Sequence, residues 1–285
     1  MEVTEGASLE ITSSEPTTNI NNVKIWLRAG TFLCNVPMLH WTSVETVTGL
    51  HGFQVRGGAA MRTEEDTTAT FATDVTFSEC ALPDEVAYGG SEGAAIANFG
   101  SLIFQGNTVF KDTPNAGALY TWGDVTFEQD AIFENNKSNG SGNGNGSGGA
   151  LYIDFDGGVN FQGATSFVNN EVTEGEGTGG WGAALYSLSS KEEPMTFAGP
   201  VTVSGNSGAN GAIAMIGSQP VVFESLVTLT DNVMEVRQKQ FPKTFLNLFE
   251  LVDVETIYRE KERYLHQLAH CCRFKVLVVL SPPTP

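Results

Sequence analysis

The chain has 285 residues, of which 41% are hydrophobic, so we expect a sizeable buried core rather than wholesale disorder. Acidic residues outnumber basic ones by 33 to 15, which gives a formal net charge of -18. This charge argues against nucleic acid or an anionic membrane as a partner, because both require a basic face. The longest strongly apolar run, residues 276–280, is too short for a transmembrane segment.

Glycine and charge divide the chain into three parts. Most of the 32 glycines lie between Gly58 and Met234, where the only basic residues are Arg62, Lys111, Lys137 and Lys191. Residues 235–285 contain no glycine and are richer in basic residues. We therefore expect an N-terminal segment, residues 1–46, a repeat domain, residues 47–234, and a C-terminal segment, residues 235–285.

The N-terminal segment contains strand-like residues 23–27, and a second strand-like stretch follows at 52–56. Together they predict one or two degenerate coils that cap the repeat domain, because an open solenoid end invites pairing with other strands. Cys34 in this segment and Cys80 in the repeat domain leave two alternatives open. They form a disulfide with each other, or they are unpaired thiols on separate coils.

Residues 58–234 repeat one pattern. A glycine-alanine-apolar step is followed by a phenylalanine and, six positions later, by a second large apolar residue. The first members of these pairs are Phe71, Phe104, Phe127, Phe161, Phe197 and Phe223. The second members are Phe77, Phe110, Phe133, Phe167, Val203 and Leu229. The segment from each pair to the next glycine varies in length, which is typical of a solenoid with loops on one face.

Alternation of polar and apolar residues, as at 124–127 and 158–161, predicts short strands. We expect an all-β parallel β-helix of about six or more three-strand coils. Stacked coils lie ~4.8 Å apart, so the two sets of apolar residues would form two internal ladders. Asparagines that follow the second ladder are expected at turns, bonding to the backbone or to each other. These are Asn136, Asn170, Asn206 and Asn232.

Two short motifs recur in order. Residues 148–151 read Gly-Gly-Ala-Leu, and residues 104–107, 133–136 and 167–170 read Phe-x-x-Asn. Across about residues 58–234 they resemble the repeats of the polymorphic outer membrane proteins. This resemblance implies a right-handed, pectin-lyase-like parallel β-helix on a cell surface, with an adhesive or antigenic role. The first residues carry no secretion signal, so we expect a fragment of a larger surface protein.

Asp154 and Asp156 are the candidates for catalysis. Two residues apart on an expected strand, they would point the same way, which suits calcium binding or acid-base chemistry on a polysaccharide. We favour an exposed acidic turn, because no lyase, hydrolase or epimerase signature accompanies them. The acidic groups at 64–66, 171–176 and 192–193 are expected to be solvating loop charges, with calcium binding as the alternative. We expect no other cofactor or metal site.

Residues 135–147 are rich in asparagine, glycine and serine, which predicts a flexible loop. The loop contains three sequons, at Asn136, Asn139 and Asn145. They are glycosylation sites if the protein is secreted by a eukaryotic cell. Otherwise they are what this composition produces by chance.

Residues 243–274 have apolar side chains at helical spacing. This helical C-terminal segment is expected to cap the last coil, to bind a partner, or to be sequence foreign to the protein. His266 and His270 are four residues apart, but a solvent-facing role is favoured over a metal site because no further ligand accompanies them.

These features predict a non-enzymatic, extracellular or cell-surface β-solenoid for adhesion, display or matrix structure. Its expected partner is a carbohydrate or another surface protein. The alternative is a polysaccharide-active lyase, hydrolase or epimerase that uses Asp154 and Asp156. A third possibility is a structural spacer without a ligand.

Overall fold

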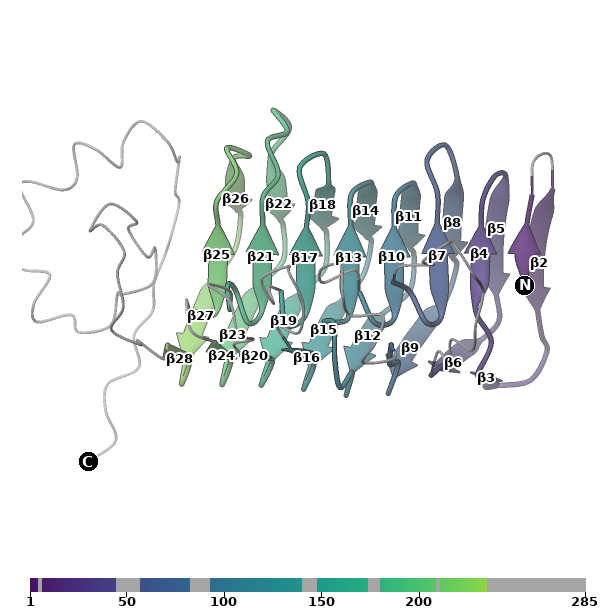
Figure 1. Ribbon diagram of the computed structural model, residues 1–285, viewed down its shortest axis with the longest axis horizontal. Helices are drawn as coiled ribbons and strands as arrows, with labels where there is room; N and C mark the ends of the chain where they lie inside the picture. Colours follow the sequence, from purple (N-terminus) through teal and green to yellow (C-terminus); the bar gives the residue numbers. More distant parts are fainter. Residues whose placement is uncertain are drawn as a thin grey trace, which may run out of the picture.

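The computed structural model describes residues 1–4, 7–44, 57–82, 93–139, 148–173, 180–208 and 211–234. These residues form short strands that stack into eight coils along one axis (Figure 1). Every coil gives one strand to each of three eight-stranded sheets, and the paired strands are parallel. For the described residues, the predicted all-β architecture of stacked parallel coils is therefore confirmed.

The strands fall into four sheets. The first sheet contains β1 (Glu2–Val3), β4 (Ile25–Leu27), β7 (Met61–Thr63), β10 (Ile96–Asn98), β13 (Leu119–Thr121), β17 (Leu151–Ile153), β21 (Leu185–Ser187) and β25 (Ile213–Met215). The second contains β2 (Ser8–Thr12), β5 (Thr31–Asn35), β8 (Thr68–Phe71), β11 (Ser101–Phe104), β14 (Asp124–Phe127), β18 (Gly158–Phe161), β22 (Met195–Phe197) and β26 (Val221–Phe223). The third contains β3 (Thr18–Asn21), β6 (Met38–Thr42), β9 (Asp74–Ser78), β12 (Thr108–Lys111), β15 (Ala131–Glu134), β19 (Thr165–Val168), β23 (Val201–Ser204) and β27 (Val227–Thr230). A smaller fourth sheet contains β16 (Lys137–Asn139), β20 (Glu171–Thr173), β24 (Ser207–Gly208) and β28 (Val233–Met234).

We number the coils 1 to 8 from the N-terminus, so that β1–β3 form coil 1 and β25–β28 form coil 8. Residues 1–44 already supply two complete coils, which pair in register with those that follow. The fourth sheet adds a strand to coils 5–8, so these coils have four strands rather than the expected three. The strand-like residues 52–56 and the helical pattern at 243–274 lie outside the described residues.

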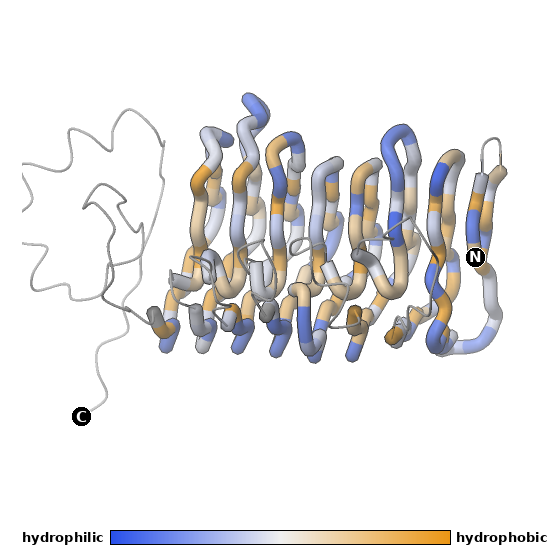
Figure 2. The backbone as a smooth tube through the Cα atoms, in the orientation of Figure 1, coloured by the Kyte–Doolittle hydropathy of each residue, from blue (hydrophilic) through white to orange (hydrophobic). Residues whose placement is uncertain are grey.

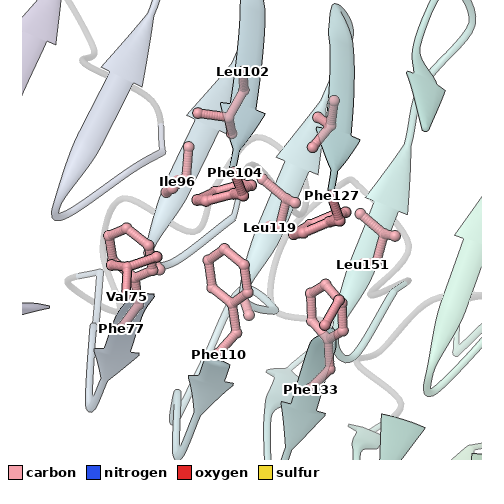
Figure 3. Close-up of a cluster of buried hydrophobic side chains, with 14 of the residues drawn as sticks. Val75, Phe77, Ile96, Leu102, Phe104, Phe110, Leu119, Phe127, Phe133 and Leu151 are labelled. Carbon is pink, nitrogen blue, oxygen red and sulfur yellow. The ribbon is translucent and has the colours of Figure 1, made fainter. Parts of the chain in front are cut away.

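Two aromatic ladders fill the interior. In the second sheet, pairing places Phe71, Phe104, Phe127, Phe161, Phe197 and Phe223 opposite one another. Their rings stack with centroids 4.6 to 5.1 Å apart. In the third sheet, Phe77, Phe110, Phe133 and Phe167 form a similar ladder, which Val203 and Leu229 continue. Rings of one ladder meet those of the other edge to face (Figure 3), an arrangement that aromatic quadrupoles favour.

Burial alternates along the strands, because successive side chains of a strand point to opposite faces. In β14, for example, Val125 and Phe127 are buried while Asp124 is exposed. Apolar and polar segments accordingly alternate along each coil (Figure 2). Full burial of one phenylalanine contributes roughly 1.5–3 kcal/mol, so the ladders supply much of the stability.

The glycine of the glycine-alanine-apolar step is required by geometry. Gly93 has φ of 65°, and an added Cβ would lie 2.1 Å from the carbonyl oxygen of Ile96. Gly182 repeats this arrangement with φ of 60° and the carbonyl oxygen of Leu185. A side chain would collide with backbone at either position, so only glycine lets the chain enter the first sheet here.

A polar ladder runs beside the aromatic ones. The side-chain amide of Asn136 donates to Oδ1 of Asn170, Asn170 donates to Asn206, and Asn206 donates to Asn232, at 2.9 to 3.0 Å. Each amide also donates to a backbone carbonyl of the third sheet, as Asn170 does to Phe133. The residues that precede the asparagines, among them Asn135 and Asn169, carry the positive φ. In each Asn-Asn pair, the first residue turns the chain and the second builds the ladder.

The corners of the coil differ in length. Strands of the second sheet reach the third sheet through short connections, such as residues 105–107, 128–130 and 162–164. Connections from the third sheet back to the first include the long segments 43–60, 79–95, 135–150 and 169–184. The corner from the first sheet to the second also varies, from residues 122–123 to residues 188–194. Variation in length is therefore largest at the corner between the third and first sheets, while the register of the three main sheets is kept.

Candidate functional site

A column of tyrosines lies on the first sheet. Tyr120, Tyr152 and Tyr186 occupy the central positions of β13, β17 and β21 and are partners in the strand register. Neighbouring rings have centroids 5.3 and 5.0 Å apart. Phe99 extends the column, at 5.6 Å from Tyr120. This column was not predicted, although the tripeptide Ala-Leu-Tyr occurs at 118–120, 150–152 and 184–186.

The two candidate carboxylates lie in a turn. Strand β17 ends at Ile153, and the amide of Gly157 donates to the carbonyl oxygen of Asp154 at 2.9 Å. The expectation that Asp154 and Asp156 share one face of a strand is therefore wrong. Glycine is needed at the end of this turn, because a Cβ at Gly157 would lie 2.6 Å from the carbonyl oxygen of Thr121 in the neighbouring coil. Asp156 is exposed, whereas Asp154 is half-buried.

Asp154 is anchored by two hydrogen bonds. The Tyr120 hydroxyl donates to Oδ2 at 2.7 Å, and the amide of Phe155 donates to Oδ1 at 2.9 Å. Both carboxylate oxygens thus accept hydrogen bonds from the protein. This geometry suits a residue that orients the tyrosine column and the turn. It gives less support to a pair of carboxylates facing each other across a glycosidic bond.

Burial raises the pKa of Tyr152, and the nearby negative charge of Asp154 raises it further. The pKa of Tyr186 is raised by the same two causes in the same order. Both hydroxyls therefore stay protonated at neutral pH and are available as hydrogen-bond donors.

An aromatic corner lies where the first sheet turns into the second sheet in coils 5–7. We define it by Trp122, Phe155, Asp154, Asp156, Asp124 and Lys191. The rings of Trp122 and Phe155, on neighbouring coils, have centroids 6.3 Å apart. Lys191 of coil 7 forms an ion pair with Asp124 of coil 5. This ion pair lies over Gly158. A Cβ added there would lie 2.5 Å from Oδ1 of Asp124 and 3.3 Å from Nζ of Lys191, so a side chain at this position would disturb the pair.

The acidic groups have mixed surroundings. Oε1 of Glu64 accepts hydrogen bonds from Trp26 Nε1 at 2.7 Å and from Arg62 Nε at 2.8 Å, and Glu171 pairs with Lys137 at 2.8 Å. Glu65, Asp66, Glu192 and Glu193 are exposed. Within the described ranges, no group of three or more His, Cys, Asp or Glu side chains is placed to hold a metal ion.

The two described cysteines are free and buried. Cys34 lies in β5, opposite Phe71, and Cys80 follows β9 in the next coil. Of the two alternatives, the structure shows unpaired thiols on separate coils. Burial raises the pKa of the Cys34 thiol to about 11 and that of Cys80 to about 12. Neither thiol is therefore a nucleophile at neutral pH.

The sequons lie in different environments. Asn136 is fully buried, and its amide group donates to Asn170 and to the carbonyl oxygen of Phe110. A glycan on Asn136 is incompatible with this position, because its amide nitrogen is committed to the interior. Asn139 ends β16, so the expected loop begins after a strand, and Asn145 lies outside the described residues.

A shallow, open hollow lies near the N-terminal end, between the second and third sheets. It is lined by Thr12, Ser13, Ser14, Glu15, Asn35, Pro37 and Thr73. With one carboxylate and no aromatic ring in its lining, it offers little for either stacking or acid-base chemistry.

In the described part of the chain, no helix is long and apolar enough to cross a membrane. The chain matches no protein-family model, no curated protein and no solved structure.

Proposed function

We propose that the chain is a non-enzymatic β-solenoid for adhesion or display, at a cell surface or outside the cell. It is built from repeats of the polymorphic outer membrane protein type and wound as a right-handed, pectin-lyase-like helix. Its partners are carbohydrates or other surface proteins. The observation that carries this proposal is that the longest connections gather at one corner of a coil whose strand register is kept.

A constant core with one variable corner separates stability from recognition. The ladders fix the backbone of each coil through contacts with its neighbours, so a connection can change length without shifting the register. Binding residues are commonly found on such segments, held by a rigid scaffold. The tyrosine column lies on the first sheet, which these connections enter, and the aromatic corner lies where that sheet leads into the second.

The alternative, a polysaccharide-active enzyme, has less support. Lyases, hydrolases and epimerases need a base or a pair of carboxylates placed around one bond of the substrate. Asp154 and Asp156 share a short turn, and both oxygens of Asp154 are held by the protein. The adhesion proposal needs no such pair.

The test uses the purified full chain on immobilised glycans and extracellular-matrix proteins. We expect saturable binding without release of reducing ends or unsaturated uronates from the same polysaccharides. Product release that Asp154→Asn abolishes would establish the enzyme instead. A chain that neither binds nor cleaves would be a spacer. Antibody labelling of intact source cells is expected to place the protein outside the membrane.

A further inference from the structure

Phe155 is unusual among the side chains that the structure describes. Of the large hydrophobic residues exposed there, Phe155 is the only aromatic one, with 54% of its surface exposed. It lies in the turn between β17 and β18, and in the sequence it stands between Asp154 and Asp156. An exposed aromatic ring carries an unfavourable hydration cost, which a ligand packed on it would remove.

The backbone that carries the Phe155 ring is held in place before any ligand arrives. The backbone amide of Phe155 donates to Oδ1 of Asp154, and the carbonyl oxygen of Phe155 accepts from the backbone amide of Ser190 in coil 7 at 3.0 Å. Asp154 is in turn fixed by Tyr120, and Trp122 packs against the ring from coil 5. A surface organised in this way loses little conformational entropy on binding.

Exposed carboxylates lie near Phe155. Asp156 follows it in the sequence, and Asp124, whose side chain is 65% exposed, pairs with Lys191 beside Gly158. An apolar face bordered by carboxylates and an ammonium group matches a sugar ring. The C–H face of a sugar packs on an aromatic ring, while its hydroxyls both donate and accept hydrogen bonds.

The surroundings argue against other ligand classes. A stable protein interface needs about 1,000 Å² or more with an apolar centre, whereas here one exposed ring stands among charged groups. Three aspartates against one lysine make the corner negative, so a sulfated or uronate polymer would be repelled. A neutral sugar avoids this repulsion.

The Trp122 ring meets the Phe155 ring at 64°, so Trp122 supports Phe155 rather than offering a second stacking face. We infer that the aromatic corner binds a neutral oligosaccharide, one sugar of which packs on Phe155 while its hydroxyls bond to Asp156 and Asp124. This inference rests on the proposed adhesive function and names the ligand class and the site.

The test compares four forms of the full chain on an array of neutral, sulfated and uronate glycans, followed by calorimetry with the best neutral ligand. Phe155→Ala removes the stacking face, and Phe155→Trp keeps one. Ile132→Ala is the matched control, because Ile132 is an exposed apolar residue of β15 in the third sheet. We expect the wild-type chain, Phe155→Trp and Ile132→Ala to bind neutral glycans, and Phe155→Ala to bind about tenfold more weakly.

Other outcomes separate the inference from the proposed function. Binding to matrix proteins or acidic glycans that Phe155→Ala leaves unchanged overturns the saccharide site but keeps the adhesive function. Neutral-glycan binding that all three variants retain moves the site elsewhere on the solenoid. Absence of binding to every glycan and every matrix protein overturns both.

Discussion

Single residues in this solenoid are defined by the ladder positions they occupy. Cys34 occupies in coil 2 the position that phenylalanine holds from coil 3 onward, and Cys80 lies three residues after Phe77 in coil 3, as Asn136 lies three residues after Phe133 in coil 5. The Sγ atom of Cys80 donates to the carbonyl oxygen of Trp41 at 3.7 Å. A small, weakly polar thiol fits either position as long as it remains protonated.

We predict that these thiols make the protein sensitive to alkaline pH. The ordinary thiol pKa is 9.0, and the folded values are about 11 for Cys34 and about 12 for Cys80. Above pH 9 the unfolded chain releases both protons while the folded chain keeps them, so stability falls as pH rises. By about pH 10.5 the loss is on the order of 2 kcal/mol for each thiol.

Urea unfolding between neutral pH and about pH 10.5 measures this loss. The Cys34→Ala, Cys80→Ala double variant serves as the control, because it lacks both thiols but keeps the tyrosines and lysines that also titrate. A wild-type curve parallel to that of the double variant would contradict the prediction.

At the scale of the elements, the asparagine ladder ties coils 5–8 together. Oδ1 of Asn170 accepts from both the backbone and side-chain amides of Asn136, and its own side chain donates to Asn206 and Phe133. Every polar atom of this buried side chain is therefore in use. Such a network stabilises the stack while it is complete and is costly when one member is missing.

We predict that Asn170→Ala lowers the free energy of unfolding by about 2–4 kcal/mol, because the buried backbone and side-chain amides of Asn136 lose their acceptor and Oδ1 of Asn206 loses one of its two donors. Asn107→Ala is the matched control, since Asn107 donates to Asp74 in an exposed position, and its effect should stay below about 1 kcal/mol. Chemical denaturation measures the free energy of unfolding of both variants. An equal decrease for the two would show that a buried ladder asparagine contributes no more than an exposed one.

The Phe-x-x-Asn motif shows what the sequence could and could not predict. At 133–136 and 167–170 the motif joins the third sheet to the asparagine ladder. At 104–107 it starts in the second sheet, and its asparagine bonds to Asp74. Both ladders consist of phenylalanine, so a local match cannot tell one corner from the next. Only the register of whole coils shows to which sheet a given Phe-x-x-Asn motif belongs.

Other elements escaped prediction for separate physical reasons. Coils 1 and 2 carry Ile11, Ile20, Cys34 and Trp41 in the ladder positions, so the phenylalanine pattern is absent there although the packing is kept. Strand β16 begins a stretch of asparagine, glycine and serine, and its pairing with β20 outweighs that composition. The site lies on the outward face, where side chains do not affect the core spacing on which the prediction relied.

For the molecule as a whole, stability is distributed along one axis. Phe127 in coil 5 is 1% exposed, whereas Phe223 and Leu229 in coil 8 are only partly buried. Leu9 and Ile11 in coil 1 are also only partly buried. In a solenoid each coil contacts only its neighbours, so a terminal coil has one stabilising interface and a central coil has two.

We predict a gradient of amide hydrogen exchange that is slowest at the centre. Strand β18 of coil 6 should exchange much more slowly than β26 of coil 8, although both belong to the second sheet, because opening a central coil breaks two interfaces. Hydrogen exchange with mass spectrometry measures this difference. Uniform protection from coil 1 to coil 8 would show instead that the stack opens as a single unit.

The order of coils along the axis also determines how the protein responds to force. Coil 1 and coil 8 lie at opposite ends of the stack (Figure 1), so tension between them acts along the hydrogen bonds that join successive coils. The interfaces between coils are in series and carry the same load, so the weakest of them, at the ends, opens first. The solenoid would therefore lengthen in steps under modest load, peeling from its ends and rewinding when released. In mechanical terms it is an extensible tether whose reach grows with each released coil.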